Sequence, residues 1–260
     1  MCIRDRPNGQ TLFAGSALMG KHAALFDSSW RQLLRYPNDA SGARVQDVLL
    51  TDLDADGKLE MYVGFAGTEG VHRVDLNGNQ VWANRQLNSV LSMTAVDSES
   101  GRRLLVTSND GSLVPIDAKG QIGQPFSIGA RAIHHLLAGP PIADEKPWYC
   151  GLTYNVHGNL FVVGLNDQLN ETWNYPLPPG SSKSQIKVGR FGQVVPGANW
   201  QWLFAAPDGS VHIVSPDGQF NDRLNTGERI NGLASFRTDE SHILVLATTS
   251  SVKAYRVGVR

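Results

Sequence analysis

The sequence is organised around one acidic loop, Asp52-Leu53-Asp54-Ala55-Asp56-Gly57-Lys58-Leu59-Glu60. Its aspartates alternate at loop positions 1, 3 and 5, which turns three carboxylates inward on one tight bend. Gly57 supplies the backbone freedom for that bend. All the donors are hard oxygens, the ligand type that calcium prefers, so the loop predicts one Ca²⁺ site. The predicted ligands are Asp52, Asp54, Asp56, the main-chain carbonyl of Lys58, and Glu60 at loop position 9.

The flanking residues indicate where this loop lies. An EF-hand would place a bidentate glutamate at position 12, and this chain has Val63 there. Short β-rich runs flank the loop at 48–50 and 61–63, in place of long amphipathic helices. We therefore expect the loop to join two strands. The alternative is a solvated acidic hairpin without metal, because turns favour Asp and Gly in any case.

The bulk composition excludes several classes of function. The chain has 260 residues, enough for one large β domain, and its 41% hydrophobic content can supply a core. Its 23 basic and 24 acidic residues give a net charge of −1, so there is no electrostatic case for binding nucleic acid or an anionic membrane. No apolar run approaches the roughly 18 residues of a membrane span.

The two cysteines carry little information about compartment. Cys2 lies in residues 1–6, which read neither as a signal peptide nor as the start of a fold. We interpret that segment as an artefact of sequence assembly or a cloning remnant. Cys150 lies in an apolar run, and we expect a buried small hydrophobe there rather than a nucleophile.

A hairpin that starts at glycine or serine recurs along the chain. The starts fall at 20, 70, 111, 158, 209 and 251, which are 50, 41, 47, 51 and 42 residues apart. That spacing is near the length of a four-stranded propeller blade. We therefore predict an all-β fold, a β-propeller of four-stranded blades with about six blade positions.

The predicted propeller domain covers residues 7–260. Full units are expected at about 45–88, 89–129, 130–183 and 184–227, with partial units at 7–44 and 228–260. The first partial unit shows no first strand and the last shows no fourth strand, so we expect sequence to be missing at the N-terminus. Residues 25–34 also fit a short helix capped at Asp27 or Ser28.

Two families resemble parts of this chain. Residues 48–64 resemble the FG-GAP/VCBS repeat, whose signature is an acidic calcium loop between adjacent blade strands. Two segments, ending in Asn77-Gly78-Asn79-Gln80-Val81-Trp82 and in Asn170-Glu171-Thr172-Trp173, resemble the turn and tryptophan of pyrroloquinoline-quinone-like propeller repeats. The first resemblance covers one blade and implies one calcium ion. The second covers most of the chain and implies a scaffold without by itself implying a cofactor.

The remaining candidates favour scaffold roles. Trp82 and Trp173 occupy comparable slots, and we expect them to pack between neighbouring blades. His72 and His212 each follow a repeat glycine, which also indicates a scaffold role. The pair at 134–135 lies on a predicted inner strand, where adjacent side chains point to opposite faces, so at most one histidine can face a channel.

These observations predict a non-catalytic, calcium-binding scaffold or recognition module that binds a protein or glycan partner at a propeller rim. Two long loop candidates, 139–147 and 176–183, are suited to recognition. An upstream domain of the same gene is a further candidate partner. We expect an extracytoplasmic protein, periplasmic or secreted, with no signal peptide in this sequence. The alternative is an enzyme that uses the central channel, such as a polysaccharide lyase or a quinone-type dehydrogenase. Ionisable side chains converging at a channel mouth would favour the enzyme.

Overall fold

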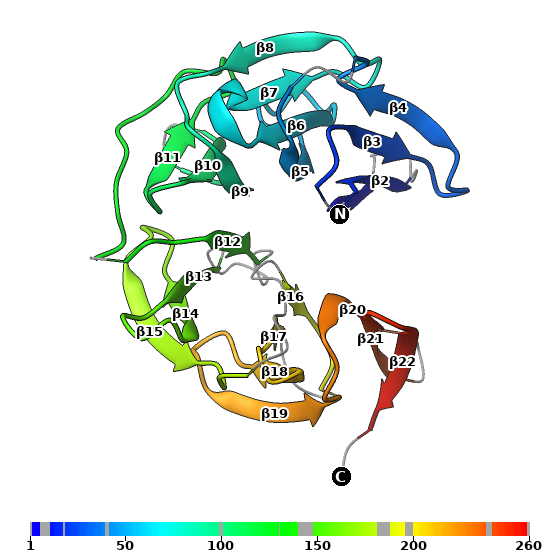
Figure 1. Ribbon diagram of the computed structural model, residues 1–260, viewed down its shortest axis with the longest axis vertical. Coiled ribbons are helices and arrows are strands. Elements are labelled where there is room, and N and C mark those ends of the chain that lie inside the picture. The colour runs from blue at the N-terminus through cyan, green and yellow to red at the C-terminus, as the bar shows by residue number, and fades with distance from the viewer. Residues whose placement is uncertain are drawn as a thin grey trace. The chain divides into compact units, whose positions relative to one another are not determined.

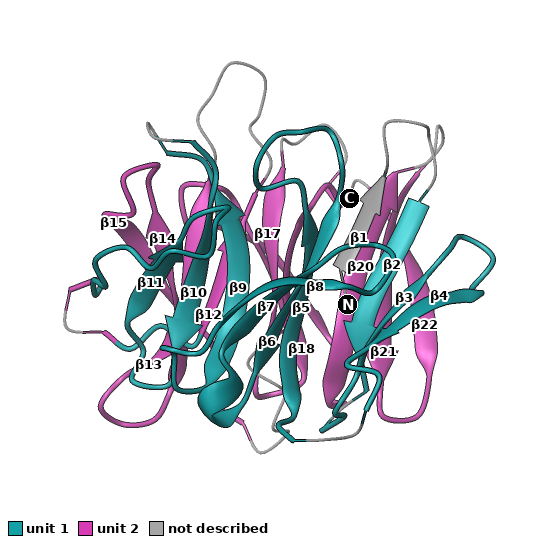
Figure 2. Cartoon of the chain, turned by 90° about the horizontal axis from the view of Figure 1, so that it is seen from above, with its two compact units in different colours: residues 1–127, 132–134 teal, residues 128–131, 135–260 magenta. Residues whose placement is uncertain are grey.

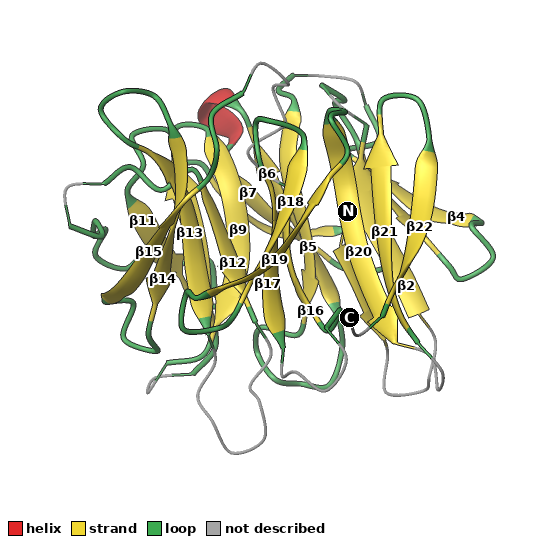
Figure 3. Ribbon diagram, turned by 90° about the horizontal axis from the view of Figure 1, so that it is seen from below, coloured by secondary structure: helices red, strands yellow, loops and turns green. Residues whose placement is uncertain are grey.

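The computed structural model describes residues 2–5, 11–17, 19–39, 42–98, 101–129, 131–139, 148–180, 188–195, 200–237 and 241–258. These residues form antiparallel sheets of three or four strands, and Figure 3 shows a short 3-10 helix, Gly67–Glu69, among them. Two compact units divide the chain (Figure 2). Unit 1 is Met1–Ser127 with Ala132–His134, and unit 2 is Ile128–Arg131 with His135–Arg260.

Unit 1 contains three sheets in chain order (Figure 1). The first is β1 (Cys2–Asp5), β2 (Thr11–Ser16), β3 (Ala23–Phe26) and β4 (Gln32–Tyr36). The second is β5 (Val45–Thr51), β6 (Glu60–Phe65), β7 (Val71–Val74) and β8 (Gln80–Asn84). The third is β9 (Val90–Val96), β10 (Arg103–Ser108) and β11 (Leu113–Ile116).

Unit 2 repeats this plan. Its first sheet is β12 (His135–Ala138), β13 (Tyr149–Tyr154), β14 (Leu160–Leu165) and β15 (Glu171–Pro176). The next is β16 (Gly189–Gly192), β17 (Gln201–Ala205), β18 (Ser210–Val214) and β19 (Phe220–Asn225). The last is β20 (Ile230–Arg237), β21 (His242–Thr248) and β22 (Val252–Val257). The described residues thus give six sheets, in agreement with the six predicted blade positions.

Within each unit, successive sheets pack face to face. The first strands of successive sheets are in contact: β1 with β5 and β5 with β9 in unit 1, and β12 with β16 and β16 with β20 in unit 2. The strand β2 alternates buried and half-buried residues because one of its faces packs on the second sheet. All six residues of β6 are buried, since both faces of its sheet are covered.

In four sheets the turn that follows the third strand has the same form. In the second sheet, the carboxylate of Asp75 accepts hydrogen bonds from the main-chain N–H groups of Asn77 (2.9 Å) and Asn79 (2.8 Å). The fourth residue of the turn, Gly78, has φ +91°, a left-handed conformation that favours glycine. The equivalent capping residues in three other sheets are Asp27, Asp117 and Asn166. Short polar side chains therefore specify the repeated hairpins.

Two tryptophans pack between neighbouring sheets, as predicted. The indole N–H of Trp82 donates to the carbonyl of Ala118 (3.0 Å), and a Cβ at Gly120 would lie 2.8 Å from the indole ring. In unit 2, Trp173 donates to the carbonyl of Pro216 (2.8 Å) and covers Gly218 in the same way. Each ring thus lies on the turn glycine of the following sheet, where no other residue would fit.

Two sequence predictions are wrong. The first sheet does have a first strand, because Cys2–Asp5 pairs with β2; an edge strand offers backbone groups that pair with any extended segment. At 25–34, where the sequence also allowed a short helix, the chain forms the hairpin of β3 and β4, and Asp27 caps its turn. The unit at about 89–129, predicted to be full, has three strands instead of four, because residues 121–127 make only isolated bridges to β11, where Pro115 has no N–H for a regular ladder. Residues 140–147 and 181–183 of the predicted recognition loops lie outside the described residues.

Candidate metal centre

The acidic loop connects β5 to β6, so the prediction that it joins two strands is confirmed. Its bend uses left-handed backbone at Ala55 (φ +59°) and Gly57 (φ +83°). The carboxylate of Asp52 accepts hydrogen bonds from the N–H groups of Asp56 (3.1 Å) and Gly57 (2.9 Å). The loop is therefore closed locally by its own first aspartate.

The four predicted carboxylates converge. One oxygen atom each from Asp52, Asp54, Asp56 and Glu60 lies within 4.8 Å of the other three. Asp54 and Asp56 are exposed, whereas Glu60 is only 5% exposed. The ammonium group of Lys58 pairs with Asp56 at 3.1 Å, and the role of the Lys58 carbonyl as a ligand stays a prediction.

An arginine that the sequence analysis did not identify completes this cluster. Nη2 of Arg73 lies 2.6 Å from Oδ2 of Asp54 and 2.8 Å from Oε1 of Glu60. The alternation of side chains along a strand could have predicted this contact. Glu60 and Tyr62 lie on the same strand face, two residues apart, and Arg73 on the neighbouring strand pairs in register with Tyr62. The arginine thus approaches the loop from the neighbouring strand.

The surroundings shift the pKa values of these groups. Burial raises the pKa of Glu60, although the charge of Arg73 opposes this shift. Burial, reinforced by the charge of Glu60, also raises the pKa of Tyr62, whose hydroxyl donates to Oε2 of Glu60 at 3.3 Å. Burial disfavours the charge on Arg73, but the hydrogen bond to Asp54 and the charges of Tyr62, Glu60 and Asp54 outweigh it and raise the pKa of the guanidinium. The main-chain and side-chain bonds from Lys58 lower the pKa of Asp56.

This donor set fits a hard divalent cation. Four carboxylates meet two side-chain cations, Lys58 and Arg73, so the cluster keeps a net negative charge. Carboxylate oxygens alone favour calcium over zinc or copper. A bound ion would compete with Arg73, because the arginine is already bonded to Asp54 and Glu60.

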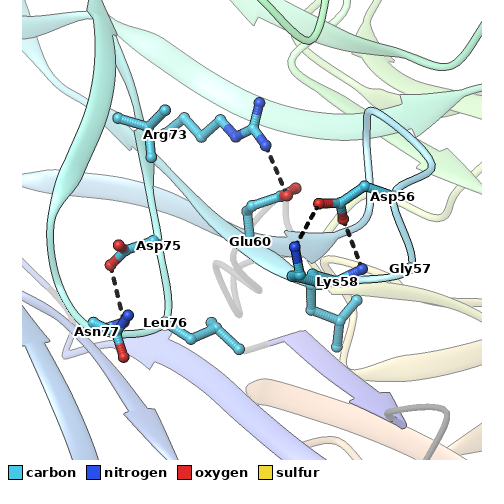
Figure 4. Close-up of a pocket in the computed structure, with 10 residues that line it drawn as sticks. Asp56, Gly57, Lys58, Glu60, Arg73, Asp75, Leu76 and Asn77 are labelled. Atoms are coloured by element: carbon cyan, nitrogen blue, oxygen red, sulfur yellow. Dashed lines mark hydrogen bonds and ion pairs between the residues drawn. The ribbon is translucent and has the colours of Figure 1, made fainter.

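An open groove of about 590 Å³ lies beside the loop (Figure 4). Loop residues 56–60 form one side, and the hairpin from β7 to β8 forms the other. Figure 4 shows Arg73 directed at Glu60, and Lys58 directed at Asp56. The carboxylate cluster is therefore accessible from a surface depression within unit 1.

Cys150 and the two repeat histidines make packing contacts within and between the sheets. Cys150 is completely buried in β13, and burial raises the pKa of its thiol, so the prediction of a buried hydrophobe is confirmed. Nδ1 of His72 and Nδ1 of His212 each form a hydrogen bond of 2.8 Å with a tyrosine hydroxyl of the preceding sheet, from Tyr36 and Tyr175 respectively. These contacts agree with the predicted scaffold role. His135 is buried at the start of β12, and burial lowers the pKa of His134.

Comparisons with known proteins identify the fold. No protein-family model matches the chain, and no curated protein matches its sequence. Among solved structures, it is similar to BBS1N in complex with ARL6DN, in crystals soaked with lead and with mercury, at a TM-score of 0.63 and 11% identity in both. The alignments cover 98% and 99% of this chain, and 77% and 78% of those chains.

A third similar structure is BamB from Moraxella catarrhalis, a propeller of the pyrroloquinoline-quinone-like type. Its TM-score is 0.55 at 14% identity, over 97% of this chain and 80% of that chain. The fold is a β-propeller. Its sheets are therefore propeller blades, and the carboxylate cluster lies on the connection between the first two strands of one blade. Within the described ranges, no helix has the length and apolar character needed to cross a membrane.

Proposed function

We propose that this β-propeller is a non-catalytic recognition module stabilised by one calcium ion. The observation that carries the proposal is the convergence of four carboxylates within 4.8 Å on one loop, as in the FG-GAP/VCBS repeats that the loop resembles. The ion would be held by Asp52, Asp54, Asp56 and Glu60, with the Lys58 carbonyl. Its chemistry would be electrostatic: it would neutralise carboxylates that otherwise repel one another.

The chain's own residues connect this loop to the next blade. Nη1 of Arg73 donates to the carbonyl of Ala118 (3.0 Å), the same oxygen that accepts the indole N–H of Trp82. Arg102 of the next blade donates to the carbonyl of Asp52 at 3.1 Å. Order in the loop is thus coupled to packing between two blades, so we expect cation binding to stabilise more than the loop itself.

For this chain we propose a protein or glycan partner at a propeller rim. BBS1N, a structure that is similar in fold, was solved in complex with the partner protein ARL6DN. We place the protein outside the cytoplasm, periplasmic or secreted. Calcium loops of extracellular modules bind at about 10⁻⁴–10⁻³ M, an affinity suited to calcium-rich surroundings.

Calcium titration tests this proposal. The chain is stripped with chelator, and its melting temperature is followed as calcium or magnesium is added. We expect a saturable rise with calcium at about 10⁻⁴–10⁻³ M, and no rise with calcium in Asp54→Ala. Asp222→Asn, on exposed strand β19, is the matched control and should respond like the wild type. An unchanged melting temperature at millimolar calcium, or an equal rise in Asp54→Ala, would contradict the proposal.

A further inference from the structure

The groove beside the acidic loop has features that calcium binding does not explain. The second blade has four antiparallel strands in the order of the sequence, so the β5–β6 loop and the β7–β8 hairpin lie at the same end of it. The groove lies between these two connections, and its volume of about 590 Å³ is within the range of ligand sites. All its lining residues belong to this blade, whose two neighbours in the chain are also in unit 1. The groove is therefore part of a propeller rim.

The floor of the groove is aliphatic. Leu59 on the loop and Leu76 in the hairpin turn are half-buried, and both pack against the core between the first two sheets. Val81 on β8 is 53% exposed. Figure 4 shows Leu76 between the hairpin turn and the loop. Three aliphatic side chains that meet at an accessible depression can cover an apolar group of a ligand.

The charged side chains around this floor do not balance. Three carboxylates, Asp56, Glu60 and Asp75, line the groove together with two cations, Lys58 and Arg73. Lys58 pairs with Asp56 at 3.1 Å, and Arg73 pairs with Glu60 at 2.8 Å. Within the part of the chain that the structure describes, Asp75 forms no ion pair. The lining therefore has one carboxylate in excess, which favours a ligand with a positive charge.

The hairpin turn determines which cation Asp75 can accept. Its Oδ1 accepts the main-chain N–H groups of Asn77 (2.9 Å) and Asn79 (2.8 Å), and its Oδ2 accepts the side-chain amide of Asn79 (2.9 Å). The bonds from Asn79 and Asn77 lower the pKa of Asp75, so the group is charged at neutral pH. A carboxylate has about four acceptor positions, and the turn uses three of them. One position on Oδ2 is left, which suits the single donor of an ammonium group and not the paired donors of a guanidinium.

We propose that this groove binds a lysine side chain of a partner protein, next to an aliphatic residue of the same segment. The ammonium group would donate to Oδ2 of Asp75, and the four-carbon stem would lie over Leu76 and Val81. The aliphatic neighbour would cover Leu59. Lysine meets both requirements because it joins a long apolar stem to a compact cation. The inference rests on the recognition role in the proposed function, whose protein partner it specifies, and it does not require calcium.

The test is a titration of the full chain, labelled with ¹⁵N and followed by NMR in the presence of EDTA. The probe is the peptide acetyl-Leu-Lys-Leu-amide. Its neutral and acidic counterparts are acetyl-Leu-Gln-Leu-amide and acetyl-Leu-Glu-Leu-amide. We expect saturable shifts at residues 56–60 and 75–81 with the lysine peptide, and weaker binding as salt is added. The two counterparts should bind at least about threefold more weakly.

Substitutions in the groove separate the charge from the apolar floor. Asp75→Asn should keep the turn, because Asn166 caps the equivalent turn before β15, and it should weaken the lysine peptide about threefold while leaving the glutamine peptide unchanged. Asp117→Asn, at the equivalent turn of the third blade, is the matched control outside the groove. Val81→Ser should weaken both peptides, since both use the floor. Val156→Ser, at a turn position that is 95% exposed, should weaken neither.

The amide spectrum of each variant reports whether the fold survives. Three results would overturn the proposal: no shifts with the lysine peptide, equal binding of the glutamate peptide, or undiminished binding by Asp75→Asn. The free amine 1,5-diaminopentane should bind more weakly than the lysine peptide, and tighter binding of this amine would overturn the assignment to a partner protein. The calcium-dependent melting shift is measured without any peptide, so failure of the proposed calcium site is distinguishable from failure of the lysine site.

Discussion

Arg73 holds Asp54 through a single nitrogen, Nη2, which lies 2.6 Å from the carboxylate oxygen Oδ2. The same nitrogen bonds to Glu60. The loop thus carries its own cation, one that stabilises it without metal and competes with metal for two of the four carboxylates. Arg73 should therefore raise the stability of the metal-free chain and lower its affinity for calcium.

Replacing Arg73 with glutamine should therefore lower the free energy of unfolding of the metal-free protein and raise its affinity for calcium. Without the guanidinium, Glu60 is buried next to Asp54 with no cation, and we expect a loss of about 1.5–3 kcal/mol in the free energy of unfolding. Calcium should then bind more tightly and restore most of the loss. Urea unfolding with EDTA and with calcium measures both effects. Arg85→Gln, which removes an exposed ion pair with Glu69, should change neither quantity by more than about 1 kcal/mol. A calcium affinity that falls in Arg73→Gln would contradict competition.

The contact between Trp82 and Gly120 should be a main support of blade packing in unit 1. A methyl group at Gly120 would lie 2.8 Å from the indole at φ +82°, so we expect Gly120→Ala to cost about 1–3 kcal/mol. Gly158→Ala is the matched control, because Gly158 is likewise the fourth residue of a side-chain-capped turn, between β13 and β14, with φ +76° but no atom within 4 Å of an added methyl group. It should show only the smaller backbone cost. Equal losses in the two variants, measured by urea unfolding, would show that the ring contact contributes nothing.

Acidification should weaken the contacts between blades through His72 and His212. Burial lowers the pKa of both histidines; Glu69 and Asp208 oppose this, and Arg85 and Arg223 add to it. The unfolded chain, with histidine pKa about 6.5, then binds more protons than the folded chain below that pH. Stability is fully present above about pH 6.5 and falls as the pH decreases toward the folded-state pKa values.

The measurement is urea unfolding at pH 7.5 and pH 5.5. We expect the His72→Gln/His212→Gln double variant to be less stable at pH 7.5, since each histidine loses a tyrosine partner, and to lose less stability on acidification than the wild type. His157→Gln, in an exposed turn, should keep the wild-type dependence. An unaltered pH dependence in the double variant would exclude these histidines as its source.

The carboxylate of Asp47 should stabilise the packing of β5 against β9, the first strands of two neighbouring blades. It accepts hydrogen bonds from its neighbour Val48 (3.0 Å) and from Met93 on β9 (2.7 Å), at a register shift of β5. Asp47→Ala leaves the N–H of Met93 without this acceptor, and we expect a loss of about 1.5–3 kcal/mol. Asp47→Asn keeps an acceptor oxygen and should lose less. Equal losses for the two substitutions, in thermal or urea unfolding, would argue against the hydrogen bond as the cause.

Local patterns determined what the sequence could predict. The acidic loop, the polar residue at each hairpin turn, and the tryptophan seven residues after Asp75 and Asn166 are all signals within a few residues of one another. Their repetition predicted the propeller and its blade positions, because each blade is built from short connections between adjacent strands. The four carboxylates could be predicted to converge for the same reason, since they lie on one loop.

Tertiary structure alone decided the contacts that join distant segments. Arg73 enters the carboxylate cluster from another strand, and its carbonyl partner, Ala118, lies in the next blade. The strand Cys2–Asp5 pairs with β2 through backbone groups, and no pattern of side chains in the sequence predicts that pairing. Trp30 reads in sequence as one more turn residue, and only the tertiary structure stacks its ring on Phe13, at a left-handed backbone position. Such contacts depend on the register between strands and on the packing of whole sheets, and neither is encoded in a local run of residues.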